Sequence, residues 1–521
     1  MPDENVKNLL LRINTLKNRL ILKSLFVGII SSLFAILYRT MIIKADLIRE
    51  YALHKYNQNR YTIIVILLIV IINSYIIDSF VKSEPMISGS GIPQIRGVVL
   101  RKIYYNPLNV VYKKLIGGFL AVVNGLSVGR EGPSIQIGAT VGMQISKVLK
   151  LNKTEEKYLV TAGASAGLAA AFNAPLSAVI FSLEELHKNF SPVILLTSMI
   201  SAIISDFISK SVFGLKPVFN FKLDNIIPLK YYPTLIALGL LTGILGVYFN
   251  RFIVKTSDFL KKCKYKIYIA SLIGVVLLIF MPQGLGGGHE LVIEITQGKF
   301  TLKFIILILI IKFIYTMISY GSSAPGGIFL PMLVIGALIG NAYSLILSKI
   351  FNFDSIYAIN FIVLAMVGYF VSVVRAPITG IILITELVGS FNHILSLSLV
   401  AFISYITAEF LKEEPIYEIL LERLLKGKAQ SREYTIHSKK KTVFDIQIST
   451  DCELDGIKIK DYKWPKGCLI VAVKRGEKEI IPEGNTILQA GDIVTILSTE
   501  ECSCKYKMLL IEKATNNTLI Q

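Results

Sequence analysis

The stretch GREGPSIQIGATVG, residues 129–142, decides how this chain is expected to fold. A turn rich in glycine and proline leads directly into an apolar segment, so a helix is expected to begin close to Glu131. Two similar turns interrupt other apolar segments, GSGIP at Gly89–Pro93 and GGIFLP at Gly326–Pro331. The sequence therefore predicts helices that begin inside an apolar region. The residues that define these turns are Gly89, Gly91 and Pro93, then Gly129, Arg130 and Pro133, and finally Gly327 and Pro331.

If these three helix starts converge in the folded protein, they are expected to bind an anion. The unpaired amides of a first turn carry partial positive charge. Partial charges hold an anion less tightly than a full Lys or Arg charge in a low-dielectric pore, which permits release. Ser90 and Tyr417 add candidate hydroxyl donors, although a helix cap for Ser90 and an interfacial aromatic for Tyr417 are the alternatives.

The composition outside these turns is that of a membrane protein. Of the 521 residues, 53% are hydrophobic and only 17% are charged, which is unusual for a soluble chain of this length. Several uncharged runs approach or exceed the roughly 20 residues that cross a bilayer as a helix. These runs are 158–183, 231–250, 267–288, 313–348 and 355–374. An all-α, multi-pass protein of the cell membrane is expected.

The formal net charge of +19 indicates how the chain is oriented in the membrane rather than binding to a nucleic acid polymer. Basic residues precede the first apolar run and follow the last one, so both termini are expected to be cytoplasmic. They are Arg12, Lys17, Arg19 and Lys23 at the start, and Arg423, Lys426, Lys428, Arg432 and Lys439 to Lys441 at the end. The expected divisions are a cytoplasmic segment at 1–19, a membrane domain at 20–425, a basic linker at 426–441 and a soluble domain at 442–521.

The membrane domain also repeats itself. PSIQIGATVG from Pro133 matches PMLVIGALIG from Pro331, and APLSAVIFSLEE from Ala174 matches APITGIILITEL from Ala376. Two related halves, about 20–220 and 230–425, are therefore expected. Duplicated membrane proteins with broken helices typically carry a transport site between the halves. The alternative is that small-residue patterns recur by chance in packed membrane helices.

Two glutamates are candidates for moving protons. A carboxylate at a helix start, such as Glu131, resembles a bound halide and could occupy the halide's site until protonation releases it. Glu184 and Glu185 end the apolar run that begins at Tyr158 and offer a second proton site. The alternative for Glu185 is a membrane-edge carboxylate that pairs with Lys188.

In this order and spacing, GSGIP, GREGP and GxFxP resemble the signatures of the CLC chloride channels and transporters. The resemblance implies a homodimer whose subunits are inverted repeats with many broken helices. Each subunit would have its own anion pathway. It implies that chloride is bound by Ser90, by the amides around Gly132, by the amides of Ile328 and Phe329, and by the Tyr417 hydroxyl. Glu131 would be the outer gate and a proton carrier.

The same resemblance bears on the choice between exchanger and channel. Glu185 matches the internal proton glutamate of the exchangers, which favours a chloride/proton antiporter over a passive chloride channel of the same fold. An enzyme is disfavoured, because the five histidines form no HExxH or other ligand spacing and no GxSxG occurs. No metal and no cofactor are expected, and chloride is the bound substrate.

From about Thr442 the pattern changes to short alternating runs, such as CLIVAVKRG and DIVTILS, separated by turn residues. A small α+β cytoplasmic domain is expected. The phrase PEGNTILQAGDIV resembles the TrkA-C (RCK-C) regulatory domain, with a turn at Gly491 and Asp492. The resemblance implies dimer contacts and a candidate small ligand, such as a cyclic dinucleotide; a domain that only steadies the dimer is the alternative.

Overall fold

The structure is a computed structural model in which two compact units, residues 1–428 and 429–521, are each described by themselves. The described residues are 3–429 except 220, 222, 224, 299, 352 and 353, and 441–515 except 451, 466, 477 and 500–508. Most of the predicted basic linker, residues 430–440, lies outside them, as do Cys502 and Cys504. Residues 426–429, expected to be linker, instead continue the last helix of the membrane unit.

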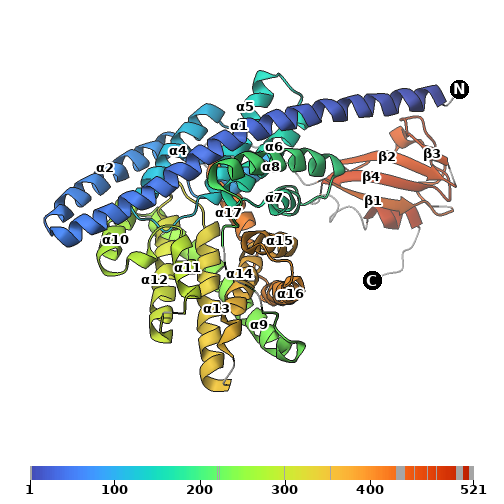
Figure 1. The fold of residues 1–521 in the computed structure, drawn as a ribbon. Helices are drawn as coiled ribbons and strands as arrows, with labels where there is room; N and C mark the ends of the chain where they lie inside the picture. Colours follow the sequence, from blue (N-terminus) through green and yellow to red (C-terminus); the bar gives the residue numbers. More distant parts are fainter. Residues whose placement is uncertain are drawn as a thin grey trace. The chain divides into compact units, whose positions relative to one another are not determined.

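The first unit is helical, and its elements follow the same order twice (Figure 1). The first series is α1 (Asp3–Gln58), α2 (Thr62–Ser83), η1 (Pro85–Ile87), α3 (Ile92–Val99), α4 (Pro107–Val123), α5 (Glu131–Val148), α6 (Lys153–Phe172), α7 (Pro175–Phe181), η2 (Ser182–His187) and α8 (Pro192–Phe213). The second is η3 (Leu229–Tyr231), α9 (Tyr232–Lys261), α10 (Lys266–Phe280), η4 (Pro282–Gly284), α11 (His289–Thr296), α12 (Leu302–Gly321), α13 (Phe329–Phe351), η5 (Ser355–Tyr357), α14 (Ala358–Val374), α15 (Pro377–Val388) and α16 (Ile394–Phe410). Helix α17 (Ile416–Ala429) follows. The short α3 and α11, of 8 residues each, occupy corresponding places.

Helix length separates membrane spans from broken helices. Within the described residues, 7 helices are long and apolar enough to cross a membrane. Three of the predicted single runs were wrong as single spans. The run 267–288 is divided between α10, of 15 residues, and η4. The run 158–183 breaks at Asn173, whose left-handed φ of 52° ends α6 before Pro175 begins α7. The run 313–348 is divided between α12 and α13 at the GGIFLP turn.

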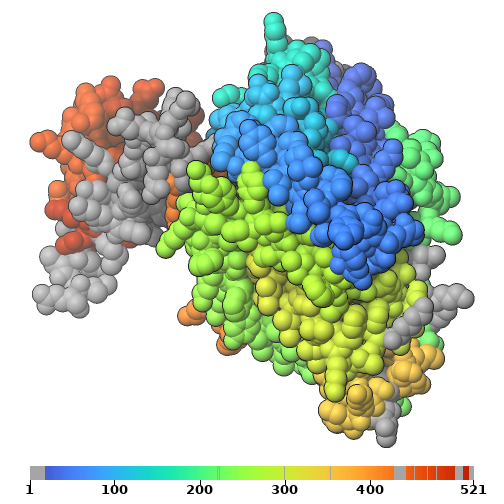
Figure 2. Space-filling model, turned by 90° about the vertical axis from the view of Figure 1, so that its left-hand side faces the viewer, coloured from blue at the N-terminus to red at the C-terminus, as the bar shows by residue number. Residues whose placement is uncertain are grey.

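Apolar side chains cover the outside of this unit. Figure 2 shows one face, on which α2 in blue adjoins α10 in yellow-green. Ile64, Leu68 and Ile72 of α2 and Leu272 and Val276 of α10 are exposed. A surface of this kind is stable against lipid rather than against water, so the fold confirms a polytopic membrane protein.

The two sequence matches are structural repeats. In the first half, α5 packs so closely on α6 that a side chain added at Gly142 would lie 2.2 Å from the carbonyl oxygen of Leu159. In the second half, a side chain added at Gly340 of α13 would lie 2.3 Å from the carbonyl oxygen of Phe361 of α14. Small residues at the same places permit both contacts, which are typical of membrane helices.

Two buried lysines also occupy equivalent places. Lys114 in α4 donates to the carbonyls of Ile87 and Gly89, at 2.8 and 2.6 Å. Lys312 in α12 donates to the carbonyls of Gly284, Leu285 and Gly286, at 3.2, 3.4 and 2.7 Å. The same number of residues separates these lysines as separates Pro133 from Pro331. Each ammonium group therefore satisfies the free carbonyls of the turn that leads into the short helix of its own half.

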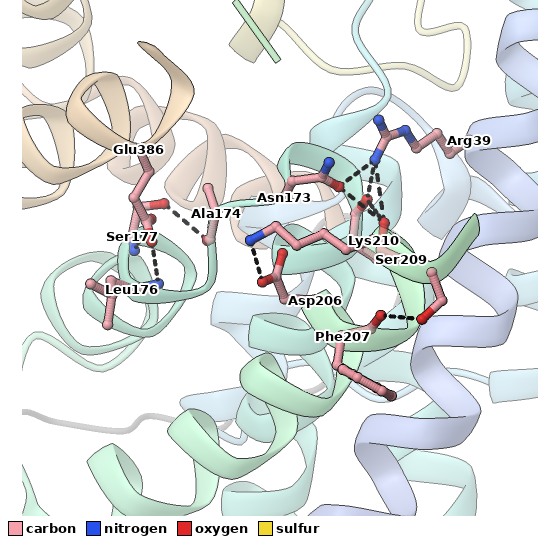
Figure 3. Close-up of polar contacts among 12 residues, drawn as sticks. Arg39, Asn173, Ala174, Leu176, Ser177, Asp206, Phe207, Ser209, Lys210 and Glu386 are labelled. Atoms are coloured by element: carbon pink, nitrogen blue, oxygen red, sulfur yellow. Dashed lines mark hydrogen bonds and ion pairs between the residues drawn. The ribbon is translucent and has the colours of Figure 1, made fainter. Parts of the chain in front are cut away.

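The halves are joined by an exchange of carboxylates. Glu184, in η2, accepts hydrogen bonds from the amides of Ile378 and Thr379 at the start of α15, at 3.2 and 2.7 Å. Glu386, in α15, accepts them from the amides of Leu176 and Ser177 at the start of α7, at 3.0 and 2.8 Å. Figure 3 shows Glu386 against that first turn. Because each helix end lies against the other helix start, α7 and α15 are related by a two-fold axis, as an inverted repeat requires.

The second unit contains an antiparallel four-stranded sheet in the order β1-β4-β2-β3. Its strands are β1 (Lys441–Gln447), β2 (Cys468–Arg475), β3 (Lys478–Ile480) and β4 (Ile493–Thr499). Alternating residues, among them Phe444, Val473 and Ile496, fill a core that also receives Leu510 from a helical stretch at 509–515. The predicted α+β domain is confirmed.

The turn before β4 lies where the sequence placed it. Gly491 has a φ of 89°, which glycine adopts without strain, and its amide donates to the carbonyl of Ile448 at 2.8 Å. The buried carboxylate of Asp492 accepts two hydrogen bonds of 2.8 Å from the Arg475 guanidinium and one of 2.9 Å from the amide of Gln489. This bidentate pair links β2 to the start of β4.

Candidate functional site

Backbone hydrogen bonds connect the three glycine-rich turns. The amide of Gly326 donates to the carbonyl of Gly89 at 3.0 Å. Gly129 and Gly327 exchange two hydrogen bonds, of 2.6 and 2.9 Å. The third turn, from the second half, therefore joins both turns of the first half. The helices that follow begin at Ile92, Glu131 and Phe329, so three helix starts lie around one point.

Ser90 and Gly132 are in direct contact. A side chain added at Gly132 would lie 2.7 Å from the Ser90 carbonyl oxygen, so only glycine lets the two turns approach this closely. The Ser90 hydroxyl is buried and accepts a hydrogen bond of 3.3 Å from the amide of Ile92. It lies in the turn before α3, whose N-cap residue is Gly91, so the helix cap given as the alternative for Ser90 is not what is observed. The same hydroxyl also lies within hydrogen-bonding range of the Tyr320 hydroxyl.

Ile328 directly precedes α13, and Phe329 is the first residue of that helix. Both are fully buried. The Phe329 ring packs against Phe172, Phe181 and Phe370, with ring centroids 5.4, 6.2 and 5.0 Å away. First-turn amides have no acceptor within their own helix. The aromatic packing fixes the direction in which these amides point.

Glu131 is fully buried at the first residue of α5. Neither carboxylate oxygen accepts a hydrogen bond that meets normal geometry from any residue that the structure describes. The closest cation is the neighbouring guanidinium, with Arg130 Nε 3.9 Å from Glu131 Oε1. A side chain added at Gly129 would lie 2.3 Å from Glu131 Oε2, so the carboxylate folds back over its own turn. A buried carboxylate without partners is costly and invites protonation or movement.

Tyr417 lies at the start of α17 and is also fully buried. Its hydroxyl has no hydrogen-bond partner among the described residues. It lies within electrostatic range of Tyr320, Glu185 and Glu131. The interfacial aromatic predicted as the alternative for Tyr417 is therefore wrong, because such a residue would expose its hydroxyl to the membrane surface.

Buried polar atoms without partners gather around these helix starts. In addition to Glu131 and Tyr417, the described ones include Arg130 Nε, Ser134 Oγ and Gln136 Oε1. Most buried polar atoms in proteins are paired, so a cluster of unpaired ones indicates a place for an ion or water. This cluster contains both donors and acceptors.

Glu185 differs from Glu184 in its surroundings. Glu184 is already engaged as the cap of α15. Glu185 is 2% exposed, and its Oε1 lies 3.2 Å from Nη1 of Arg96. The surface pairing predicted as the alternative for Glu185 is not what is observed, because the hydrogen-bonded partner is a buried arginine rather than Lys188. Lys188 instead pairs with Glu418.

Two further residues near the glutamates serve packing. His187 is half-buried, and its Nε2 lies 2.6 Å from the hydroxyl of Thr161. Gln136 donates to the carbonyl of Met86 at 2.8 Å and packs against Gly91. Both side chains are thus held in place by the surrounding helices.

Several buried cations could not be predicted as site residues from the sequence. Arg39 in α1 donates to the carbonyl of Ala170 and to the side chains of Asn173 and Ser209, at 3.0, 2.7 and 3.3 Å (Figure 3). It thereby holds the left-handed break between α6 and α7. The same holds for Arg96, Lys114 and Lys312. A single charge within an apolar helix was the available signal, and for the lysines the repeat spacing was a second one.

A cavity of about 310 Å³ reaches Gly129, Arg130 and Leu330. Its walls mix both signs of charge and include Asp46, Arg49, Glu50, His289 and Glu290. Because Gly129 also contacts Glu131, water can come close to the buried carboxylate on this side.

These features define a class, the polytopic membrane proteins in which two related halves enclose an ion site at the starts of broken helices. Residues 70–409 match the sequence profile described as voltage gated chloride channel, and residues 443–501 match that of the TrkA-C domain. The chain belongs to the voltage gated chloride channel family, the CLC family, and carries a C-terminal TrkA-C domain.

Individual relatives agree with this assignment. The chain is 34% identical over 366 residues to a protein of Vibrio campbellii named H(+)/Cl(-) exchange transporter ClcA, covering 68% of this chain and 77% of that protein. The protein of the same name from Yersinia pestis is 32% identical over 359 residues, covering 67% of this chain and 75% of that protein. A solved structure of a slow cyanobacterial Cl-/H+ antiporter is similar with a TM-score of 0.74 and 28% identity, covering 80% of this chain and 99% of that chain. A CLC-type fluoride/proton antiporter, at 20% identity and a TM-score of 0.63, shares the fold over 77% of this chain and 97% of its own.

Proposed function

We propose that this protein is a chloride/proton antiporter. The observation that carries the proposal is the buried carboxylate of Glu131, which has no hydrogen-bond partner of normal geometry among the described residues, at the point where three helix starts converge. A carboxylate there competes with an anion for the same amides, and protonation removes the competition. The second buried carboxylate, Glu185, supports exchange rather than passive conduction, as do the relatives named exchange transporters.

The anion is proposed to bind Ser90, the amides around Gly132 and those of Ile328 and Phe329, and the Tyr417 hydroxyl. Donors without full charge support chloride as a transported ion rather than a trapped one. Glu131 is proposed as the outer gate and a proton carrier, and Glu185 as the inner proton site. The activity proposed here requires no cofactor, no metal and no enzymatic step.

The further assignments follow the family and the charge pattern. We propose a homodimer in the cell membrane with both termini in the cytoplasm, and a membrane domain at about 20–425. The basic residues on either side of the apolar region support this orientation. The TrkA-C domain is proposed to contact its counterpart in the dimer, with a small ligand such as a cyclic dinucleotide as a candidate regulator.

Proteoliposomes test the proposal directly. Purified protein is reconstituted with a chloride gradient, and chloride and proton movements are recorded together. In an exchanger, chloride that moves down its gradient drives protons in the opposite direction, uphill against the proton gradient. This proton movement persists when the membrane potential is clamped. Chloride flux without any proton movement would instead establish the passive channel, and absence of both fluxes would contradict either form of the proposal.

A further inference from the structure

Arg96 holds two carboxylates at once. It lies in α3, the short helix that follows the GSGIP turn, and its side chain is 10% exposed. Nη1 lies 3.2 Å from Glu185 Oε1, and Nη2 lies 3.2 Å from Glu418 Oε1. Arginine presents several donors in a rigid planar fork, so a single side chain can connect two acids that belong to different helices.

The two carboxylates differ in how much they depend on Arg96. Glu185 is 2% exposed, so its carboxylate can stay ionised only with a cation beside it. Without that cation, the carboxylate would bind a proton. Glu418 is 34% exposed and also pairs with Lys188. When Glu185 accepts a proton, Arg96 loses its attraction to that side and keeps the attraction to Glu418.

Glu418 follows Tyr417 directly in α17. Any change in how Arg96 holds Glu418 therefore acts on the first turn of the helix that carries Tyr417. Further titratable groups lie near Glu185 among the described residues. They are Glu184, on the same segment, and Tyr417, on α17. On α6, Lys157 acts on the adjacent His187.

We propose that Arg96 is a positioning residue that links the protonation of Glu185 to the placement of Tyr417 through Glu418. No covalent step is involved: a proton arrives on the Glu185 carboxylate, its ion pair with Arg96 is lost, and Arg96 settles on Glu418. The inference rests on the proposed roles of Glu185 as the inner proton site and Tyr417 as an anion donor.

The test compares Arg96→Gln with Arg96→Lys and Arg101→Gln in the full chain. Arg101 follows α3, is exposed, and so serves as the matched control. Proton flux is measured in proteoliposomes across internal pH. Arg96→Gln is expected to move the midpoint of proton flux to higher pH by about one to three units, because a carboxylate loses that much acidity without a neighbouring cation. Arg96→Lys keeps a cation beside Glu185, so its midpoint should lie close to the wild-type value. Arg101→Gln should leave the midpoint unchanged.

Chloride affinity gives a second measurement that does not depend on proton transport. Calorimetric titration with chloride across pH is expected to show a pH-dependent affinity in the wild type. Glu131→Gln is used as the background, because it removes the dependence expected from the gate. In that background the remaining pH dependence should be lost when Arg96→Gln or Glu185→Gln is added, and adding both should be no worse than adding either one. Equal midpoints for Arg96→Gln and Arg101→Gln, or additive effects when both substitutions are added, would overturn the inference. If the wild type moves no protons, the antiporter proposal fails, and the affinity measurements alone decide the role of Arg96.

Discussion

Glu184 and Glu386 cap helices reciprocally. Glu184 accepts a hydrogen bond of 2.7 Å from the amide of Thr379 at the start of α15, the helix that carries Glu386. Glu386 accepts one of 2.8 Å from the amide of Ser177 at the start of α7, which leads into the segment that carries Glu184. The two acids therefore serve the joint between the halves. This assignment separates Glu184 from Glu185, its direct neighbour in sequence, which faces Arg96 instead.

Replacing either capping acid should weaken the fold and leave ion coupling intact. Glu184→Gln and Glu386→Gln are each expected to cost about 1–2 kcal/mol, because a carboxylate at a helix start is replaced by a neutral amide. Thermal unfolding in detergent measures the loss, with the exposed Glu409→Gln as the control. If Glu184→Gln instead abolishes proton coupling without lowering stability, Glu184 belongs to the proton path.

Glu131→Gln should produce chloride flux without protons. The neutral side chain no longer competes electrostatically with the anion and no longer carries a proton. Paired chloride and pH recordings in proteoliposomes measure the result. Glu290→Gln, in the wall of the cavity that reaches Gly129 and Arg130, is the control and should stay coupled. Retained coupling in Glu131→Gln would remove Glu131 from the gate.

Glu185→Gln should stop proton movement while chloride still passes, because Glu185 is proposed to lie off the anion path. The same recordings apply, and the chloride flux of the variant should stay within about tenfold of the wild type, a change of about 1.4 kcal/mol in barrier. Full proton coupling in Glu185→Gln would show that another group or a water path delivers the proton.

Ser90→Pro should shift anion preference from chloride toward nitrate. The substitution removes the hydroxyl that accepts a hydrogen bond from the amide of Ile92 and that is proposed to donate to the anion. Ser90→Ala removes the hydroxyl without adding a ring, so comparing the two separates loss of the donor from the change of backbone. Flux ratios for chloride and nitrate measure the preference, and equal ratios in all three proteins would place Ser90 outside the site.

Deleting residues 442–521 should leave an inserted, active membrane domain. The helical unit has its own core and holds all three glycine-rich turns. Size-exclusion chromatography with light scattering measures the oligomeric state, and proteoliposome flux measures the activity. A monomeric but folded product would make the TrkA-C domain the element that holds the dimer together.

Asp492 should make the TrkA-C domain sensitive to acid. Burial alone would raise the pKa of Asp492, but hydrogen bonds from Arg475 and from the Gln489 amide outweigh it and hold the pKa below its usual value. Its contribution to stability is therefore complete above about pH 4 and is lost as the pH falls further. Hydrogen exchange of β4 in the full chain measures this, and Asp492→Asn should lower protection at neutral pH by about 1–3 kcal/mol. Unchanged protection in Asp492→Asn would show that the turn does not need the ion pair.

Much of this architecture could be predicted from local sequence, because glycine, proline and apolar runs act within a few residues. The helix starts after GSGIP, GREGP and GGIFLP were predicted, and so was the turn at Gly491 and Asp492. The breaks within 158–183 and 313–348 were not predicted, since apolar composition alone does not distinguish one long helix from two short ones.

The contacts between distant segments were harder to predict. Arg96 lies three residues after the GSGIP motif, but its partners Glu185 and Glu418 lie far along the chain, and only the folded structure brings them together. The exchange between Glu184 and Glu386 was visible as an equal spacing from two prolines, but that spacing gave no indication of which helix start each acid would meet.

The hydrogen bonds between Gly326 and Gly89, and between Gly327 and Gly129, have a consequence for biosynthesis. The ribosome releases the first two turns long before the third, so a nascent or prematurely terminated chain contains Glu131 and Ser90 without the segment that completes their surroundings. An unfinished chain therefore lacks the turn that completes the ion site, and we expect transport only after the third turn has been synthesised.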